Sequence, residues 1–207
     1  MIRALYALTF LAITSIATSA PQDTCDTFKI SYQGLGCCPS DAPDVNMSAI
    51  TTYEGRIAAF GLTKGEMTLP NGYTYDYLAA GPPSGPKVLL LHGFPSPSYM
   101  WRNQMKALAS AGYRAVAPDQ RGYSPRARPA GYDVYGDSVT AEMLDAYSQN
   151  KLTEDVLGFA DHLWGAGSKF HLLTHDWGAV VGWHVTLNHP GRLHSFACLA
   201  VPHPQVG

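Results

Sequence analysis

The segment at residues 169–183 constrains the fold more than any other part of the chain. It begins with an apolar, strand-like run that ends abruptly at Asp176, and glycine and other small residues follow with the spacing of a helix. A strand that turns sharply into a helix at one polar residue is the pattern of a nucleophile elbow. An Asp in this position can also simply cap the next helix. Gly178 and Gly182 favour the elbow, because they let the helix approach the sheet closely.

From residue 87 onward, short apolar runs alternate with segments of helical periodicity. The runs predict strands at residues 88–91, 113–117, 170–173 and 193–201, and the periodic segments predict helices between Pro97 and Gly112, at 152–163 and at 178–188. Continuous apolar strands are typical of a parallel sheet that is covered on both faces. The sequence therefore predicts an α/β fold, a mostly parallel sheet flanked by helices.

Two further regions have less regular patterns. Upstream of residue 87, residues 57–62 and 66–79 resemble strands, and the second of these is predicted to fold back on itself through a turn at residues 70–72. Residues 120–147 contain several Gly, Pro and Arg and are predicted to be loop-like.

Polar or Gly- and Pro-rich clusters follow several of the predicted strands. Ligands bind at the carboxyl ends of strands in open sheets of this type, and four clusters fall at such ends: residues 92–95, 119–123, 176–177 and 202–204. The backbone N–H groups of Phe94 and Trp177 are predicted to form an oxyanion hole, in a loop shaped by His92, Gly93 and Pro95. A plain turn is the alternative for that loop. Arg121 and Asp119 either line the rim of the site or, as is favoured, form a buried ion pair that holds their loop.

A carboxylate at the elbow narrows the chemistry. It can displace at a saturated carbon and leave an alkyl-enzyme ester, so epoxides and haloalkanes are the expected substrates. A histidine and an acid would then activate water to cleave that ester. His175 adjoins Asp176 in a strand, so its side chain is expected on the opposite face. No cofactor is needed, and no group of His, Cys and acidic residues has the spacing of a metal site.

At this point the chain resembles the N-terminal part of an α/β-hydrolase of the epoxide hydrolase family. The resemblance runs from about residue 57 to residue 204, and its matching stretches are residues 92–95 with 101–104, 118–124 and 175–179. It implies the first six or so strands of an α/β-hydrolase sheet, with Asp176 as the nucleophile and a small apolar epoxide as the substrate. Residues 202–204 match the point where the family's lid domain begins.

The chain departs from this family in two respects. The family usually has Gly at the position of Thr174, where a side chain is expected to crowd the elbow. The family also places two lid tyrosines, a second acid and the water-activating histidine beyond the position of residue 207. The chain is therefore predicted to be incomplete and inactive in turnover, with its last strand as an unpaired apolar edge.

Two alternatives stay open beside the epoxide hydrolase. Haloalkane dehalogenases share the elbow, and Trp177 stands where some of them place a halide-binding indole. A non-catalytic secreted domain that binds small apolar ligands or a protein partner is the other.

The N-terminus predicts secretion. Residues 1–20 have a basic start, an apolar core and a small-residue cleavage site, which is the pattern of a signal peptide. Residues 21–55 are predicted to be a cysteine-containing extension, and residues 56–207 the partial hydrolase core. After signal removal no membrane anchor is expected.

If the chain is secreted, two local sequence patterns predict covalent modifications, namely a disulfide and a glycosylated asparagine. An oxidising route favours a disulfide from Cys25 to either Cys37 or Cys38, and Asn46 begins a glycosylation sequon. Cys198 lies in an apolar run and is predicted to be a buried free thiol. The formal net charge of -2 includes no long basic run, so neither nucleic acid nor an anionic membrane is an expected partner, and the oligomeric state is open.

Overall fold

The computed structural model describes residues 52–129 and 140–203. The predicted signal peptide, the extension with Cys25, Cys37, Cys38 and Asn46, and Pro204 lie outside the described residues, so secretion, the disulfide and glycosylation stay predictions. The chain divides into two compact units, Met1–Ala59 and Phe60–Gly207.

The first unit contains one described helix, α2 (Tyr53–Ala59). The prediction of a strand at residues 57–62 is therefore wrong, because residues 57–59 are helical and the first strand begins only at Thr63. The hydroxyl of Thr52 accepts a hydrogen bond from the N–H of Gly55 at 3.0 Å, which caps a helix. Glu54 in the first turn and the alanines at the end also favour a helix over a strand.

The second unit opens with the predicted hairpin, and here the prediction is confirmed. Strands β1 (Thr63–Thr68) and β2 (Thr74–Ala80) pair antiparallel. The turn between them is closed by two hydrogen bonds, from the N–H of Leu69 to the carbonyl of Tyr73 at 3.0 Å and from the N–H of Gly72 to the carbonyl of Leu69 at 2.9 Å. Gly72 has a φ of 84°, a conformation that glycine adopts without strain.

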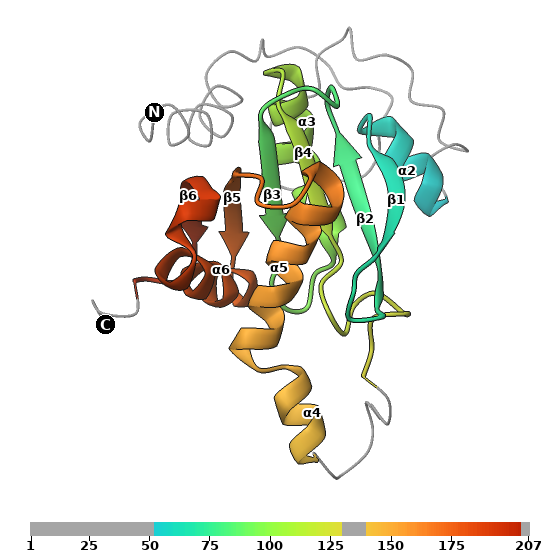
Figure 1. Ribbon diagram of the computed structural model, residues 1–207. Helices are drawn as coiled ribbons and strands as arrows, with labels where there is room; N and C mark the ends of the chain where they lie inside the picture. Colours follow the sequence, from blue (N-terminus) through green and yellow to red (C-terminus); the bar gives the residue numbers. More distant parts are fainter. Residues whose placement is uncertain (1–51, 130–139, 204–207) are drawn as a thin grey trace, which may run out of the picture. The chain divides into compact units, whose positions relative to one another are not determined.

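The sheet has six strands in the order β1-β2-β4-β3-β5-β6 (Figure 1). The four further strands are β3 (Lys87–Leu91), β4 (Arg114–Pro118), β5 (Phe170–His175) and β6 (Leu193–Leu199). These four run parallel to one another, and β2 pairs antiparallel with β4. The fold is thus the mostly parallel α/β sheet that the sequence predicts.

Helices cover both faces of this sheet (Figure 1). Helix α3 (Arg102–Ser110) follows the short helix η1 (Ser98–Trp101) on one face, and α5 (Gln149–Trp164) and α6 (Trp177–Asn188) lie together on the other. A short turn of helix, η2 (Pro190–Arg192), leads from α6 into β6.

The span 120–147 is less loop-like than predicted. It contains helix α4 (Ala141–Ala146), whose first turn is capped by the hydroxyl of Thr140 accepting from the N–H of Met143. Capping and good helix formers explain why this part of the span is helical.

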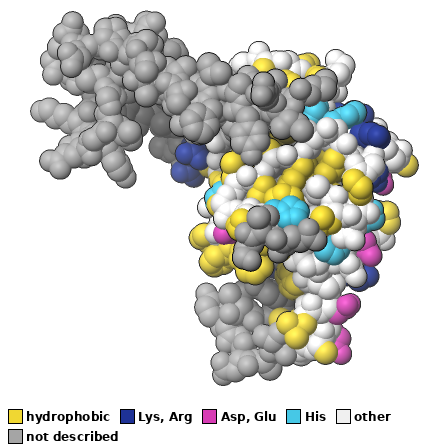
Figure 2. All heavy atoms as spheres, turned by 90° about the vertical axis from the view of Figure 1, so that its left-hand side faces the viewer, with side chains coloured by type: hydrophobic (Ala, Val, Ile, Leu, Met, Phe, Trp, Pro, Cys, Tyr) yellow, Lys and Arg dark blue, Asp and Glu magenta, His cyan; other side chains and the backbone are white. Residues whose placement is uncertain are grey.

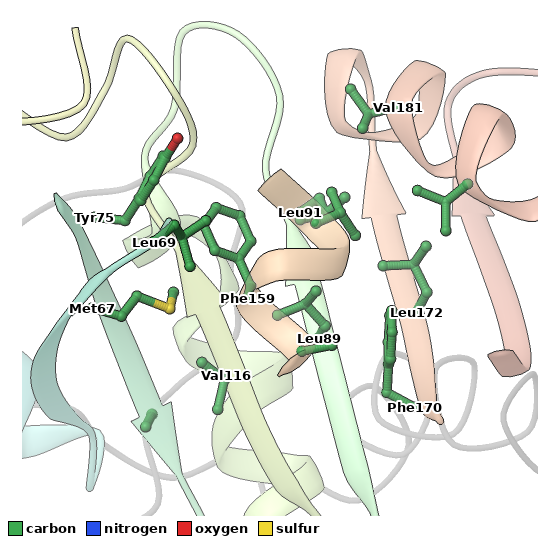
Figure 3. Close-up of a cluster of buried hydrophobic side chains, with 14 of the residues drawn as sticks. Met67, Leu69, Tyr75, Leu89, Leu91, Val116, Phe159, Phe170, Leu172 and Val181 are labelled. Carbon is green, nitrogen blue, oxygen red and sulfur yellow. The ribbon is translucent and has the colours of Figure 1, made fainter. Parts of the chain in front are cut away.

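The main core lies between the sheet and helices α5 and α6 (Figure 3). Tyr75 on β2 meets Phe159 on α5 edge to face, with ring centroids 4.8 Å apart. Val181 of α6 joins the same cluster from the other end. This packing fixes α5 and α6 over the strands whose carboxyl ends carry the site.

Strand β6 forms one edge of the sheet and, among the described residues, pairs with β5 alone. Cys198 on this strand is partly exposed rather than buried as predicted, because one side of its strand lacks a neighbour in the described part of the chain. Figure 2, viewed from the β6 side of Figure 1, shows apolar side chains interspersed with histidines on this face. No helix within residues 52–129 and 140–203 is long and apolar enough to cross a membrane.

Candidate active site

Asp176 lies at the sharp turn between β5 and α6. Its φ of 54° and ψ of -125° are unusual for a residue with a side chain, and such a conformation costs on the order of 1–3 kcal/mol. The surrounding strand and helix hold it there. Although Asp176 occupies the position before the first helical residue, its side chain makes no capping hydrogen bond. The geometry thus does not support a simple capping role.

Two backbone amides hold the carboxylate. The N–H of Phe94 donates to Oδ1 of Asp176 at 2.9 Å. The N–H of Trp177 and, after it, that of Phe94 hold the pKa of Asp176 below its ordinary value, since both stabilise the charged form. The side chain is only partly buried. Asp176 is therefore an ionised, accessible carboxylate that lies between two N–H donors.

Two glycines permit this close approach. A Cβ on Gly93 would overlap the Cβ and Oδ1 atoms of Asp176. A Cβ on Gly178 would lie 2.5 Å from the carbonyl oxygens of both Leu91 and His92. Glycine at these positions is what lets the loop after β3 and the start of α6 enclose the carboxylate. The peptide bond between Phe94 and Pro95 in that loop is cis.

Thr174, the departure in the strand before the elbow, is accommodated by packing. It is fully buried, and its Cγ2 would lie 2.7 Å from a Cβ on Gly182. The absence of a side chain at Gly182 thus leaves room for the threonine methyl group. The hydroxyl of Thr174 donates to the carbonyl of Ala197 at 3.4 Å on β6.

His92 holds two loops together and has no free nitrogen for catalysis. Its Nε2 accepts from the N–H of Gln120 at 3.0 Å, which leaves Nδ1 as the donor to the carbonyl of Gly93 at 3.1 Å. The ring is fully buried, and burial lowers its pKa. Gln120 returns a hydrogen bond from its side chain to the carbonyl of His92. His92 is thus a neutral residue that orients the loop.

The buried ion pair of this region has a different partner from the one expected. Arg121 pairs with Asp155 of α5, through Nε to Oδ2 at 2.8 Å and Nη2 to Oδ1 at 2.6 Å. Its third nitrogen, Nη1, donates to the carbonyl of Ala146 at 2.6 Å. Asp119 instead accepts from the N–H of Ser98. The predicted pair with Asp119 is wrong, since the carboxylate that reaches Arg121 comes from a helix more than thirty residues away in the sequence.

A cleft of about 380 Å³ opens beside the elbow. The loop after β3, the loop after β4, the start of α5 and the start of α6 all contribute to its wall, through His92, Gly93, Phe94, Gln120, Arg121, Tyr123, Tyr147, Gln149, Leu152, Trp177 and Val181. Phe94 and Trp177 are 71% and 63% exposed, unusually high for large aromatic side chains. The site is thus an open, largely apolar cleft next to a carboxylate.

The structure brings together three of the four clusters expected at the ends of strands. Residues of 92–95, 119–123 and 176–177 contribute to the cleft, whereas Pro202 and His203 are not part of its wall. Sequence reasoning missed Tyr147, Gln149 and Leu152. The i, i+3 spacing of Gln149 and Leu152 places both residues on one face of a helix, which is the available signal. The predicted loop at residues 120–147 and the predicted helix at 152–163 leave Gln149 between them, so the sequence does not place it at the site.

Within the described residues, no group of three or more His, Cys, Asp or Glu side chains could hold a metal ion.

The sequence of this chain matches the model of a known protein family. The model of the alpha/beta hydrolase fold family matches residues 86–206, which is more than half of the chain and spans β3 to the end of β6. The chain belongs to this family.

Several curated relatives are similar to about two thirds of this chain. Epoxide hydrolase A of Mycobacterium tuberculosis is 41% identical over 132 residues, which is 64% of this chain and 37% of that protein. Epoxide hydrolase 3 of Siraitia grosvenorii is 39% identical over 63% of this chain and 36% of its own length. The chain thus spans less than half the length of these relatives.

Solved structures give the same result. The crystal structure of epoxide hydrolase VrEH1 from Vigna radiata superposes with a TM-score of 0.55 at 39% identity, over 69% of this chain and 41% of that chain. An epoxide hydrolase from a hot-environment metagenome has a TM-score of 0.59 at 31% identity, over 70% and 44% of the two chains. These two relatives and these two structures are all epoxide hydrolases.

Proposed function

We propose that this α/β-hydrolase chain opens epoxides by nucleophilic attack of Asp176. The observation that supports the proposal best is the accessible carboxylate at a positive-φ turn, held by the N–H groups of Phe94 and Trp177. A carboxylate used only for structure gains nothing from a strained backbone and an open apolar cleft. The epoxide hydrolase relatives support the same chemistry.

The first step forms an ester. The carboxylate oxygen of Asp176 that is not held by Phe94 attacks a ring carbon of the epoxide. As the new C–O bond forms, the ring C–O bond breaks and its electron pair stays on the ring oxygen. That oxygen takes a proton from solvent water to become a hydroxyl group, and the hydroxide left behind is neutralised by the proton that hydrolysis of the ester later releases. The low pKa of Asp176 keeps the nucleophile ionised for this attack.

The second step is hydrolysis of that ester. Water adds to the carbonyl carbon of the Asp176 ester, and the negative charge develops on the oxygen that faces the N–H of Phe94. One such preorganised donor contributes about 3 kcal/mol of transition-state stabilisation. Collapse of the intermediate releases the diol and restores the carboxylate.

Hydrolysis also needs a base for the water. Of the histidines in the described residues, His92 alone contributes to the cleft wall, and both of its ring nitrogens are engaged. Two others are bonded elsewhere, His171 with Ser195 and His184 with Thr153. We therefore propose that the 207-residue chain forms the ester faster than it cleaves it.

Heavy-oxygen water tests both steps. The chain is exposed to less than one equivalent of a terminal epoxide in H₂¹⁸O, and the diol and the Asp176 peptide are weighed. Attack by Asp176 predicts unlabelled diol from the first turnover and label in the carboxylate of any chain that has turned over. Label in the first-turnover diol would show direct attack by water and overturn the proposal. Accumulation of an esterified chain is the expected sign of slow hydrolysis.

Haloalkane dehalogenation is a second candidate, favoured by the indole of Trp177, which stands exposed beside the carboxylate. Halide release from a chloroalkane, with no ester formed from an epoxide, would select it. A non-catalytic binding domain is the third possibility. It would form no ester with an epoxide or a haloalkane, and Asp176→Asn would leave its affinity for ligands unchanged.

A further inference from the structure

One polar side chain in the cleft wall has hydrogen-bonding capacity that the described residues do not use. The three nitrogens of the Arg121 side chain bond to Asp155 and Ala146, both ring nitrogens of His92 are engaged, and the Nε2 of Gln120 donates to His92. Gln149 differs from these three. Its Oε1 is buried and has no hydrogen-bond partner within residues 52–129 and 140–203.

Leaving such an oxygen without a donor is unfavourable. A buried acceptor that has lost its water and gained no partner costs about as much as a lost hydrogen bond. Rotation of a carboxamide about its last torsion exchanges Oε1 and Nε2. A group that both donates and accepts would therefore pair with Gln149 in either orientation.

The backbone that carries Gln149 is firmly placed. Gln149 is the first residue of α5, directly after the junction with α4. Arg121 clamps this junction on both sides, because it bonds to Ala146 before it and to Asp155 within α5. Leu152, one turn after Gln149, also lines the cleft. Gln149 is thus a polar residue of the cleft wall, between Tyr147 and Leu152, on a backbone that Arg121 holds in place.

We propose that Gln149 is a specificity-determining residue that binds a hydroxyl group of the substrate, away from the carbon that Asp176 attacks. The substrate class is then an epoxide with an apolar body, which contacts Trp177, Leu152 and Val181, and a hydroxyl substituent that hydrogen-bonds Gln149. The inference rests on the proposed function for the identity of the reacting group. The hydrogen bond between the ligand hydroxyl and Gln149 does not depend on whether Asp176 is a nucleophile.

A matched pair of ligands tests the inference. One is a terminal epoxide whose alkyl chain ends in a hydroxyl group, and the other is the same epoxide with a methyl group in place of that hydroxyl. Dissociation constants are measured by NMR titration with the Asp176→Asn chain, which binds the epoxide without forming an ester. The hydroxyl ligand is expected to bind about tenfold more tightly than the methyl ligand, the effect of one net hydrogen bond.

Variants at and beside position 149 complete the test. In the Asp176→Asn background, Gln149→Met keeps the length of the side chain and removes its polar atoms, so the tenfold preference should disappear. Asn150→Ala, on the same turn but exposed and outside the cleft wall, should keep the preference. Thermal unfolding of each variant checks that the fold is retained. Equal affinities for the two ligands before mutation, or a preference that survives Gln149→Met, would overturn the inference.

The outcome is separable from that of the proposed function. The chain with Asp176 intact is treated with the same two epoxides and examined for ester formation. A binding preference with no ester supports the role of Gln149 and refutes the nucleophile. Ester formation without a preference refutes Gln149 alone.

Discussion

Two aspartates of this chain are held in opposite ways. Asp176 is partly exposed and bound by backbone N–H groups at a strained turn, and its pKa is lowered. Asp155 is 3% exposed and bound by the side chains of Arg121 and Asn71, and burial raises its pKa against the pull of Arg121. One arrangement keeps a charged oxygen available to a ligand, and the other uses the charge entirely within the protein.

The two aspartates have different roles, since Asp176 is placed for chemistry and Asp155 for stability. Asp176 is held by backbone donors and stays partly exposed, whereas Asp155 is buried and uses both oxygens on side-chain partners. Removing the carboxylate of Asp176 should therefore abolish ester formation and change the free energy of unfolding little. Removing the carboxylate of Asp155 should mainly lower the free energy of unfolding.

The largest expected effect is on ester formation by Asp176→Asn. The amide retains the shape of the side chain and tolerates a positive φ, but it is not a nucleophile. We expect the single-turnover rate with a terminal epoxide to fall by at least about a thousandfold. The midpoint of urea unfolding should change little. A rate within about tenfold of the unmutated chain would remove Asp176 from the chemistry.

The reverse effect is expected at Asp155. Asp155→Leu leaves Arg121 buried without its partner, so the free energy of unfolding should fall by about 3–5 kcal/mol. The double variant Asp155→Leu with Arg121→Met removes both charges and should recover most of that loss. The exposed pair of Glu66 and Arg126 is the matched control, where Glu66→Gln should lower the free energy of unfolding far less than Asp155→Leu does, because solvent screens an exposed pair. Equal losses in the buried and exposed pairs would contradict the comparison.

A smaller effect is expected when the loop is pushed away from Asp176. In Gly93→Ala the new methyl group overlaps the carboxylate, so the loop must shift and the hydrogen bond from Phe94 is lost. Ester formation should fall by about ten- to a hundredfold, because the shifted loop misplaces the carboxylate relative to the epoxide. Gly191→Ala, where a Cβ meets nothing within 4 Å, should leave the rate unchanged. Similar rates of ester formation for the two variants would show that the close approach of the loop to Asp176 does not matter.

These effects also show what the sequence could and could not reveal. The elbow was predictable because strand, turn and helix lie within fifteen consecutive residues, and so was the parallel sheet, whose strands are short apolar runs. The partner of Arg121 was not predictable, because Asp155 is far from Arg121 in the sequence and is brought next to it only by the packing of α5. A strand was predicted at residues 57–62, but the chain forms a helix at residues 53–59, because the cap by Thr52, the acidic Glu54 in the first turn and the alanines at the end favour a helix.

The smallest expected effect is on pH dependence. Because the pKa of Asp176 is lowered, the ionised form persists below the range of an ordinary Asp. The rate of ester formation should thus stay level as the pH falls and decline only below about 3.9, the value of an unperturbed Asp. Stability linked to this group is likewise present above that value and lost as the pH falls through the lowered pKa. A decline centred at or above the ordinary value would show that the two amides do not stabilise the charge.

The most direct measurement is the mass of the Asp176 peptide after brief treatment of the 207-residue chain with a terminal epoxide at neutral pH. The account predicts a peptide heavier by the mass of one epoxide, with fragmentation that places the addition on Asp176 and with no such product in Asp176→Asn. An unmodified Asp176 peptide in a chain that nevertheless consumes the epoxide would contradict the central claim.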